Sequence, residues 1–325
     1  MIRHGEQDMG KNELHAISML QASTASLAFM QPRAVAAYLG LAIGDALGAT
    51  VEFMTPREIR ALFGTHDEIC GGGWLRLKPG QVTDDTTMSL ALGQSILSAG
   101  GIDALNVAQA FDAWMRAKPV DIGNTVRRGI VHFRTSSLPH VPPNEHDAGN
   151  GAAMRVLPVA LATLGKPETD VRAACRLQAH VTHNNVLSDT ATECLALMVQ
   201  DLLLGAGRND VLRTRIEPFI RQHPEFEFRR RHCENPSGYI VETLQAVFQA
   251  FFETENYRDC LVNVVNRGGD ADTTGAIAGM LAGTLYGFDE LPRRWLDALG
   301  MNSRLACQNQ AHALMELAFQ TGGSS

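Results

Sequence analysis

The sequence predicts an all-α fold in a single compact multi-helix domain. Apolar residues recur at the three- and four-residue spacing of helix faces, whereas alternating apolar and polar runs with turn residues are missing. The 325 residues are 45% hydrophobic, which is ample for a large core. We expect this domain at residues 32–319, with a flexible extension at 1–31 and a disordered tail at 320–325.

The helices can be placed in order from their apolar spacing and their end signals. The first is expected to start near Pro32, because proline suits the first turn of a helix. The second starts at Asp84 and ends at Gly100, since glycine commonly follows a helix. Further helices are predicted at 105–117, 126–133, 171–178, 187–204, 211–221, 239–252, 275–287 and 305–319.

Composition excludes several classes of function. The net charge of -7 gives no general attraction to nucleic acid or to anionic membranes. The six cysteines are scattered without metal-site or disulfide spacing, which favours free thiols in a reducing compartment. No apolar run approaches the roughly 18 to 20 residues of a membrane helix, and acids interrupt the first 31 residues where a signal peptide would be basic. We therefore expect a cytoplasmic protein.

Two similar acidic segments lie far apart in the chain. Thr83–Thr87 reads Thr-Asp-Asp-Thr-Thr, and Asp270–Thr274 reads Asp-Ala-Asp-Thr-Thr. Each opens onto a run of small and apolar residues, which places it at a helix N-terminus. Asp and Thr are common helix caps at such positions, so either segment alone is explained without a ligand. Their near repetition suggests instead that both contribute to one site.

If the two segments converge, they form a site of hard oxygen ligands. Four carboxylates brought together in a core would repel one another unless cations neutralised them. Carboxylate and hydroxyl oxygens without His or Cys suit Mg²⁺ or Mn²⁺ better than Zn²⁺. We therefore expect two Mn²⁺ or Mg²⁺ ions. The predicted ligands are Thr83, Asp84, Asp85, Asp270, Asp272 and Thr273.

Four further features have both a structural and a functional interpretation. Glu52 lies between Val51 and Phe53 and is either an ordinary exposed glutamate or a site acid. Asp121 is either a helix cap or a functional acid. The Gly149-Asn150-Gly151 sequence forms either a tight turn or a loop whose backbone approaches a ligand. His180 and His183 lack a third zinc ligand, so we expect His183 to bind a ligand or a neighbour by hydrogen bonds.

Taken in order, these segments resemble the ADP-ribosylglycohydrolase family, over roughly Arg33 to Leu317. The resemblance is strongest to the branch that acts on dinitrogenase reductase. It implies an all-helical enzyme with a dinuclear Mn²⁺ or Mg²⁺ centre, which removes ADP-ribose from the modified arginine of that protein. The motifs that carry it are Gly44–Gly48 with Glu52, Thr83–Thr87, Pro119–Gly123, Gly149–Arg155, Thr182–His183 and Gly269–Thr274.

The resemblance also implies roles for individual residues. The six predicted ligands match those of the family, and the ions would hold the ribose 2′ and 3′ hydroxyls. Asp121 is expected to be the acid-base group, with Glu52 positioning water or metal. The residues expected to contact ADP-ribose are Asn150, Gly149, Gly151, His183, Tyr239 and Gly123.

Other functions remain open from the sequence. A relative could cleave a serine-linked or a small ester ADP-ribosyl bond, or bind ADP-ribose without catalysis. A generic dinuclear phosphohydrolase would instead release phosphate from nucleotides. For the preferred function, the expected partners are ADP-ribosylated dinitrogenase reductase, the product ADP-ribose and a PII signalling protein. Regulation by peripheral membrane association is also implied by the resemblance, and no nucleic acid is expected.

Overall fold

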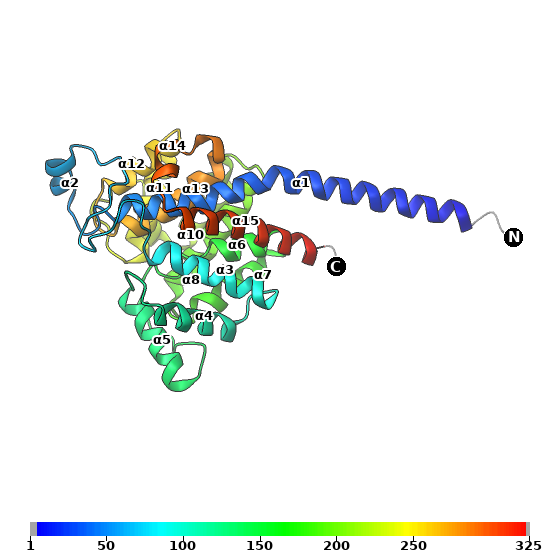
Figure 1. The fold of residues 1–325 in the computed structure, drawn as a ribbon, viewed down its shortest axis with the longest axis horizontal. Coiled ribbons are helices and arrows are strands. Elements are labelled where there is room, and N and C mark those ends of the chain that lie inside the picture. The colour runs from blue at the N-terminus through cyan, green and yellow to red at the C-terminus, as the bar shows by residue number, and fades with distance from the viewer. Residues whose placement is uncertain (1–4, 323–325) are drawn as a thin grey trace.

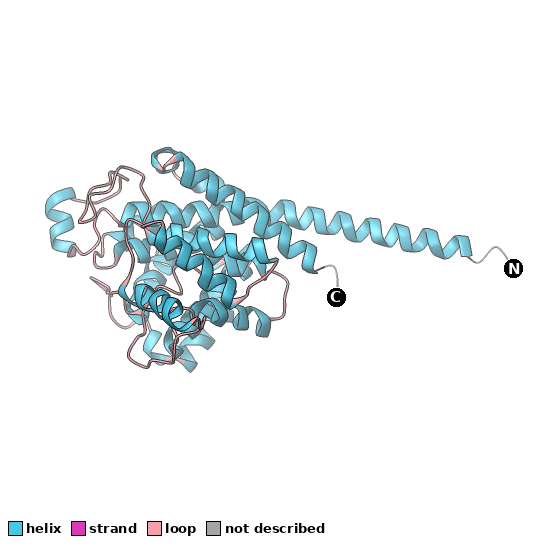
Figure 2. Cartoon of the chain, turned by 60° about the horizontal axis from the view of Figure 1, so that its bottom comes forward, coloured by secondary structure: helices cyan, strands magenta, loops and turns pink. Residues whose placement is uncertain are grey.

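The computed structural model describes residues 5–322, with side chains from 27 to 320. Helices joined by loops make up this part of the chain, as Figures 1 and 2 show. No strand occurs between residues 5 and 322; two isolated bridges, Gly72 with Leu77 and Gly149 with Tyr239, are the sheet-like pairings found there. The all-α prediction is therefore confirmed. The predicted extension and tail fall in part on residues 1–4 and 323–325, outside the described residues.

Most predicted helices are present, with boundaries that differ by a few residues. The observed helices are α1 (Gly5–Gly48), α2 (Pro56–Phe63), α3 (Asp84–Ala99), α4 (Ala104–Arg116), α5 (Asn124–Ser136), α6 (Leu157–Ala162), α7 (Glu168–Ala179), α8 (Val186–Leu203), α9 (Arg208–Val211), α10 (Glu217–Gln222), α11 (Ile240–Glu253), α12 (Tyr257–Val265), α13 (Ala271–Tyr286), α14 (Arg293–Ala298) and α15 (Met301–Gly322). Helices α2, α6, α12 and α14 were not predicted. The single helix predicted at 211–221 is interrupted by a π-helical turn at Leu212–Ile216, just before Pro218, which has no N–H to donate.

Helix α1 differs most from its prediction. It begins at Gly5, so Pro32 lies inside the helix and the predicted start near Pro32 is wrong. From Ala34 to Leu47 nearly every side chain is buried, which marks a helix that crosses the core. The stretch Leu27–Gly48 is long and apolar enough to cross a membrane by length and composition alone, yet 67% of its apolar 18-residue segment is buried in the fold. Core helices pass the same test. Figure 1 shows the N-terminal end of α1 projecting from the body.

Helix α13 packs along α1 at very short range. A Cβ atom added to Gly44 would lie 1.9 Å from the carbonyl oxygen of Gly275, and one added to Gly40 would lie 2.2 Å from that of Gly279. Both distances are far inside van der Waals contact, so only glycine fits at these positions. The two helices therefore approach backbone to backbone, and the N-terminal end of α13 is fixed against the C-terminal end of α1. Figure 1 shows α15 running beside α1.

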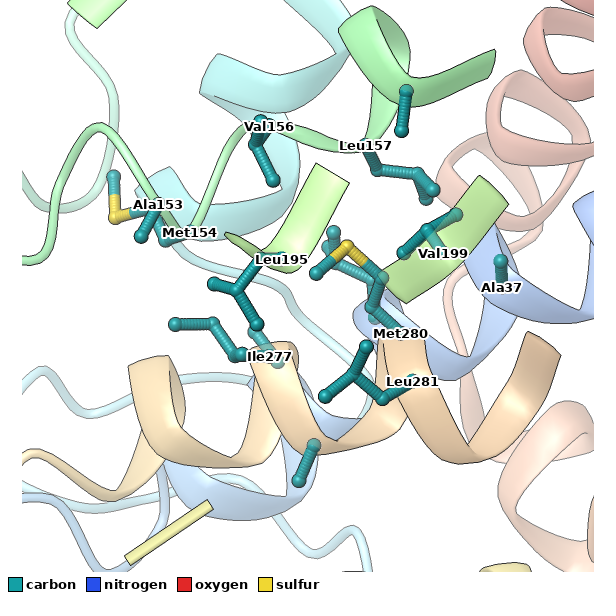
Figure 3. Close-up of a cluster of buried hydrophobic side chains, with 14 of the residues drawn as sticks. Ala37, Ala153, Met154, Val156, Leu157, Leu195, Val199, Ile277, Met280 and Leu281 are labelled. Carbon is teal, nitrogen blue, oxygen red and sulfur yellow. The ribbon is translucent and has the colours of Figure 1, made fainter. Parts of the chain in front are cut away.

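The apolar core joins α13 to the middle of the chain. Leu195 and Val199 of α8 lie among Ile277 and Met280 of α13, as Figure 3 shows. The cluster is completed by four residues that lead into α6, namely Ala153, Met154, Val156 and Leu157. This segment directly follows the Gly149-Asn150-Gly151 loop. The core thus holds that loop in a fixed position relative to α13, whose first turn carries the second acidic segment.

Candidate metal centre and substrate cavity

The first acidic segment is held by a buried carboxylate of α1. Asp45 accepts hydrogen bonds from the backbone N–H and hydroxyl of Thr83, both at 2.9 Å. Its other oxygen accepts from the backbone N–H of Thr86 at 3.1 Å and from the Thr86 hydroxyl at 2.5 Å. Thr83 is the N-cap of α3, yet its side chain makes no capping hydrogen bond. The helix-cap interpretation is therefore wrong for Thr83, whose hydroxyl proton is directed to Asp45.

The second acidic segment is held by its backbone. Gly268 and Gly269 have φ of 70° and 65°, the left-handed region that favours glycine. A Cβ added to Gly268 would lie 2.0 Å from the Met54 carbonyl oxygen, so the segment is clamped against the loop that follows α1. Asp270 is the N-cap of α13 but makes no side-chain capping bond either. One of its carboxylate oxygens instead accepts from the Asn150 amide at 2.5 Å.

Side chains of the two segments meet although they lie nearly 190 residues apart. The Thr273 hydroxyl donates to Asp85 Oδ2 at 3.2 Å. Thr83 Oγ1 lies 3.4 Å from both Asp85 Oδ2 and Asp272 Oδ2. Because its proton is directed to Asp45, the Thr83 oxygen keeps a lone pair for a cation. The structure thus brings together the residues of the predicted metal centre.

Glu52 joins this cluster from the turn after α1. Its carboxylate and those of Asp270 and Asp272 offer oxygens that all lie within 4.8 Å of one another. Glu52 is buried, and one of its oxygens accepts from the Trp74 indole N–H at 2.7 Å. Its interpretation as an ordinary exposed glutamate is therefore wrong.

The cluster is electrostatically strained in the absence of a cation. Burial, and then the neighbouring carboxylates, raise the pKa of Asp84 to about 7. Burial raises the pKa of Glu52 to about 8, with the charges of Asp270, Asp121 and Asp84 adding to the shift. The pKa of Asp85 and that of Asp272 are raised well above the usual range for the same reasons. Positive charge placed among these oxygens would reverse the shifts.

One orphaned atom supports a metal at this position. Asp85 Oδ1 is buried and has no hydrogen-bond partner among the described residues. A buried carboxylate oxygen without a partner is costly, and a cation would satisfy it. The donors that converge here are carboxylate and hydroxyl oxygens, the hard ligands that Mg²⁺ and Mn²⁺ prefer. The residues present therefore fit a divalent metal site.

A cavity of about 340 Å³ opens above the cluster. Thr83 and Asp85 lie fully buried beneath it, and Tyr239, 41% exposed, does not line it although it is bridged to Gly149. The sequence-predicted residues that do line the cavity are Glu52, Asp84, Asp121, Gly123, Gly149, Asn150, Gly151, His183, Asp270, Asp272 and Thr273.

Another part of the cavity lining is polar but not acidic, and it is centred on His183. The buried guanidinium of Arg155 donates to the Thr182 hydroxyl at 2.8 Å, and that hydroxyl lies 2.7 Å from His183 Nδ1. This contact fixes the orientation of the ring, whose Nε2 faces the Gly149-Asn150-Gly151 loop. Burial, helped by the charge of Arg155, lowers the pKa of His183 to about 3. His183 is thus neutral, and its ring occupies the space that a side chain at Gly149 or Gly151 would need.

Two residues that organise the site were not among the predicted site residues. Asp45 stood out only as part of a Gly-Asp-Ala-Leu-Gly motif, and its burial on a helix that is apolar on all sides was the available signal. Trp74 follows three glycines in a loop, and nothing in the sequence connects it with Glu52. Its role depends on how that loop folds back on the end of α1.

Comparisons with known proteins agree with this site. Residues 27–323 match the family model for ADP-ribosylglycohydrolase. The chain is 49% identical to the ADP-ribosyl-[dinitrogen reductase] glycohydrolase of Rhodospirillum rubrum over 286 residues, 88% of this chain and 96% of that protein. It is 31% identical to the ADP-ribosylarginine hydrolase Tri1 of Serratia proteamaculans, over 88% of this chain and 80% of the relative. A solved structure titled ADP-ribosylglycohydrolase-related protein complex superimposes with a TM-score of 0.79 at 36% identity, covering 89% of this chain and 99% of that one.

Proposed function

Because the chain belongs to the ADP-ribosylglycohydrolase family, we propose that it hydrolyses the bond between ADP-ribose and the modified arginine of dinitrogenase reductase. The observation that carries this proposal is the meeting of the two acidic segments under one cavity. Similarity to the Rhodospirillum rubrum enzyme, and to an arginine-specific relative, supports both the linkage and the protein substrate.

We further propose that the site holds two Mn²⁺ or Mg²⁺ ions. The ligands would be the carboxylates of Asp84, Asp85, Asp270 and Asp272 and the hydroxyls of Thr83 and Thr273. When bound, such ions would orient the ribose hydroxyls and lower the pKa of water at the site. Asp45 contributes by holding Thr83, and through it the start of α3, in place.

The remaining acids are proposed to serve proton transfer. Hydrolysis adds water across the C–N bond, so one proton leaves the water and one reaches the guanidine nitrogen. Asp121 lines the cavity, and the N–H of Ile122 fixes one of its oxygens at 2.7 Å. We assign proton transfer to Asp121. Glu52, held by Trp74 beside Asp270 and Asp272, is assigned to positioning water or metal.

The Gly149-Asn150-Gly151 loop is proposed to bind the diphosphate. The Asn150 amide donates to Thr243 at 2.9 Å and to Asp270, which fixes the loop between α11 and the acidic cluster. Its flanking glycines let the backbone pack against the neutral ring of His183, and all three residues line the cavity. Tyr239 is bridged to Gly149, which lines the cavity.

The experiment that tests the function is release of ADP-ribose from defined substrates. Arginine-linked ADP-ribosylated dinitrogenase reductase, an arginine-linked peptide and a serine-linked peptide are incubated with Mn²⁺ and the protein. We expect release from both arginine-linked substrates. Release from serine alone would contradict the proposal, and binding of ADP-ribose without release from any substrate would identify a non-catalytic module. Control by a PII protein and peripheral membrane association stay predictions from the resemblance.

A further inference from the structure

Two large aromatic side chains are exposed together at the edge of the cavity. Phe53 is 64% exposed and lines the cavity, and Trp74 is 53% exposed. Their ring centroids lie 5.5 Å apart with the planes inclined by 45°. We call these two residues the aromatic pair. Single exposed apolar residues are common, but two adjacent rings beside a polar cavity form a surface that favours a ligand.

The backbone holds Phe53 in a conformation that is costly for a bulky residue. Its φ is 62°, in the left-handed region that few non-glycine residues adopt. The Phe53 N–H donates to the Gly269 carbonyl at 2.7 Å, and the Gly269 N–H donates to the Met54 carbonyl at 3.0 Å. These paired bonds fix the strained residue directly beside the second acidic segment. Strain of this kind is found where the placement of a side chain matters for function.

Trp74 is fixed just as firmly although its ring is exposed. The preceding Gly73 lies so close to the end of α1 that an added Cβ would be 2.6 Å from the Ala49 carbonyl oxygen. The indole N–H donates to Glu52 at 2.7 Å. The polar edge of the ring is therefore satisfied inside the protein, while much of its surface remains in solvent. A rigid aromatic surface binds a ligand at a low cost in conformational entropy.

The charges around the aromatic pair favour a cation. Glu52, which Trp74 binds, lies beside Asp270 and Asp272, and Asp121 lines the same cavity. These carboxylates, together with Asp45, Asp84 and Asp85, outnumber the positive charges of two divalent ions. Guanidinium groups stack on aromatic faces, and the attraction is strengthened by nearby negative charge.

We propose that the aromatic pair binds the guanidinium of the modified arginine and thereby selects arginine-linked substrates. The proposal rests on the proposed function and names the residues that recognise the leaving group. Phe53 and Trp74 act in binding and in specificity, and they take no part in proton transfer. The adenine ring of ADP-ribose is the competing occupant, since it also stacks on aromatic residues, but it carries no charge that the acids would attract.

The test removes the ring of Phe53 and compares two quantities. These are KM for the arginine-linked substrate and the inhibition constant for the product ADP-ribose. Phe53→Leu keeps an exposed apolar side chain but loses the ring face, and Phe53→Tyr keeps the ring. With an arginine-linked peptide, Phe53→Leu is expected to raise KM about 2- to 5-fold with kcat unchanged, the range for an exposed cation–π contact. Its inhibition constant for free ADP-ribose should stay at the wild-type value. Phe53→Tyr should match the wild type in both measurements.

Other outcomes overturn the proposal in distinguishable ways. If Phe53→Leu raises the inhibition constant for ADP-ribose as much as KM, the aromatic pair holds the nucleotide. If KM for the arginine-linked peptide is unchanged, the ring binds nothing. Failure of the proposed function is a separate result: the wild-type protein itself would then release no ADP-ribose from the arginine-linked peptide.

Discussion

The two acidic segments resemble each other in sequence but are held in place by different physics. Thr83–Thr87 is fixed by hydrogen bonds to one buried carboxylate, Asp45, which accepts from two backbone N–H groups and two hydroxyls. Asp270–Thr274 is fixed by glycine contacts, first at Gly268 and then along α13. Hydrogen bonds to a buried carboxylate therefore hold the first segment at the centre, whereas close backbone packing holds the second.

Both supports come from the same end of α1. Asp45 binds the first segment, and Gly44, its neighbour in sequence, lies against Gly275 beside the second. A short stretch of one helix therefore sets the distance between the two halves of the centre. This explains how ligands from opposite ends of the chain reach one cavity without a sheet or a second domain.

Loss of Asp272, a proposed metal ligand that contacts the other acidic segment, should have the largest effect. Asp272→Ala removes a buried carboxylate that lies beside Thr83 and Glu52. We expect a loss of kcat greater than the roughly 10- to 100-fold that follows changes around, rather than at, metal ligands. The measurement is the rate of ADP-ribose release from arginine-linked substrate at saturating Mn²⁺. Full activity in this variant would refute its assignment as a ligand.

Disturbing the packing support should mainly reduce stability. Gly44→Ala places a Cβ 1.9 Å from the Gly275 carbonyl oxygen, so α1 and α13 must separate. Overpacking of this kind costs about 1–3 kcal/mol of unfolding free energy. Gly101→Ala is the matched control, because an added Cβ there meets nothing within 4 Å. Denaturant unfolding of both variants makes the comparison, and equal stability would show that the close approach is not needed.

Disturbing the polar support should mainly reduce metal affinity. Asp45→Asn keeps the shape of the side chain but turns an amide N–H towards the donors of Thr83 or Thr86. The start of α3 then loses a hydrogen-bond acceptor and shifts. We expect Mn²⁺ affinity to fall about 10- to 100-fold, as for other residues that orient metal ligands. Mn²⁺ affinity is measured by calorimetric titration, and unchanged affinity would show that Asp45 does not orient the metal ligands.

The pH dependence of stability should reveal the strain of the acidic cluster. Folding raises the pKa of Asp84 to about 7 and that of Glu52 to about 8, so the folded state binds more protons than the unfolded state between about pH 4 and pH 8. Stability of the metal-free protein should therefore fall as pH rises through this range. His183, with its pKa lowered to about 3, acts oppositely but only below about pH 6.5.

The acids are therefore best observed between pH 6.5 and pH 8, below the range in which the buried thiols begin to contribute. When a chelator keeps the protein free of metal, we expect its Tm to drop by a few degrees across this range, and saturating Mn²⁺ to reduce that drop. A Tm of the chelated protein that rises with pH over this window would contradict the proposed origin of the shifts.

The sequence predicted the fold class and the convergence of the acids, but it did not predict their supports. The repeated acidic pattern identified both segments because metal chemistry restricts which side chains can be used. Asp45 was assigned no role because, although an acid on an otherwise apolar helix indicates burial, nothing in the sequence shows which groups it meets. Trp74 and the close contact of Gly44 with Gly275 depend on which elements meet in space. The sequence likewise did not reveal the π-helical turn at Leu212–Ile216, which interrupts the helix predicted at 211–221.

A double-variant experiment tests whether the two acidic segments form one metal centre. Mn²⁺ binding is titrated for the wild-type protein, Asp85→Ala, Asp272→Ala and the double variant. Because the two carboxylates belong to one centre, each single change should greatly weaken binding, and the double change should add little more. Two results would contradict a shared metal centre and show that the segments serve separate sites. One is a single variant that binds Mn²⁺ like the wild type, and the other is a double variant whose loss of binding free energy equals the sum of the two single losses.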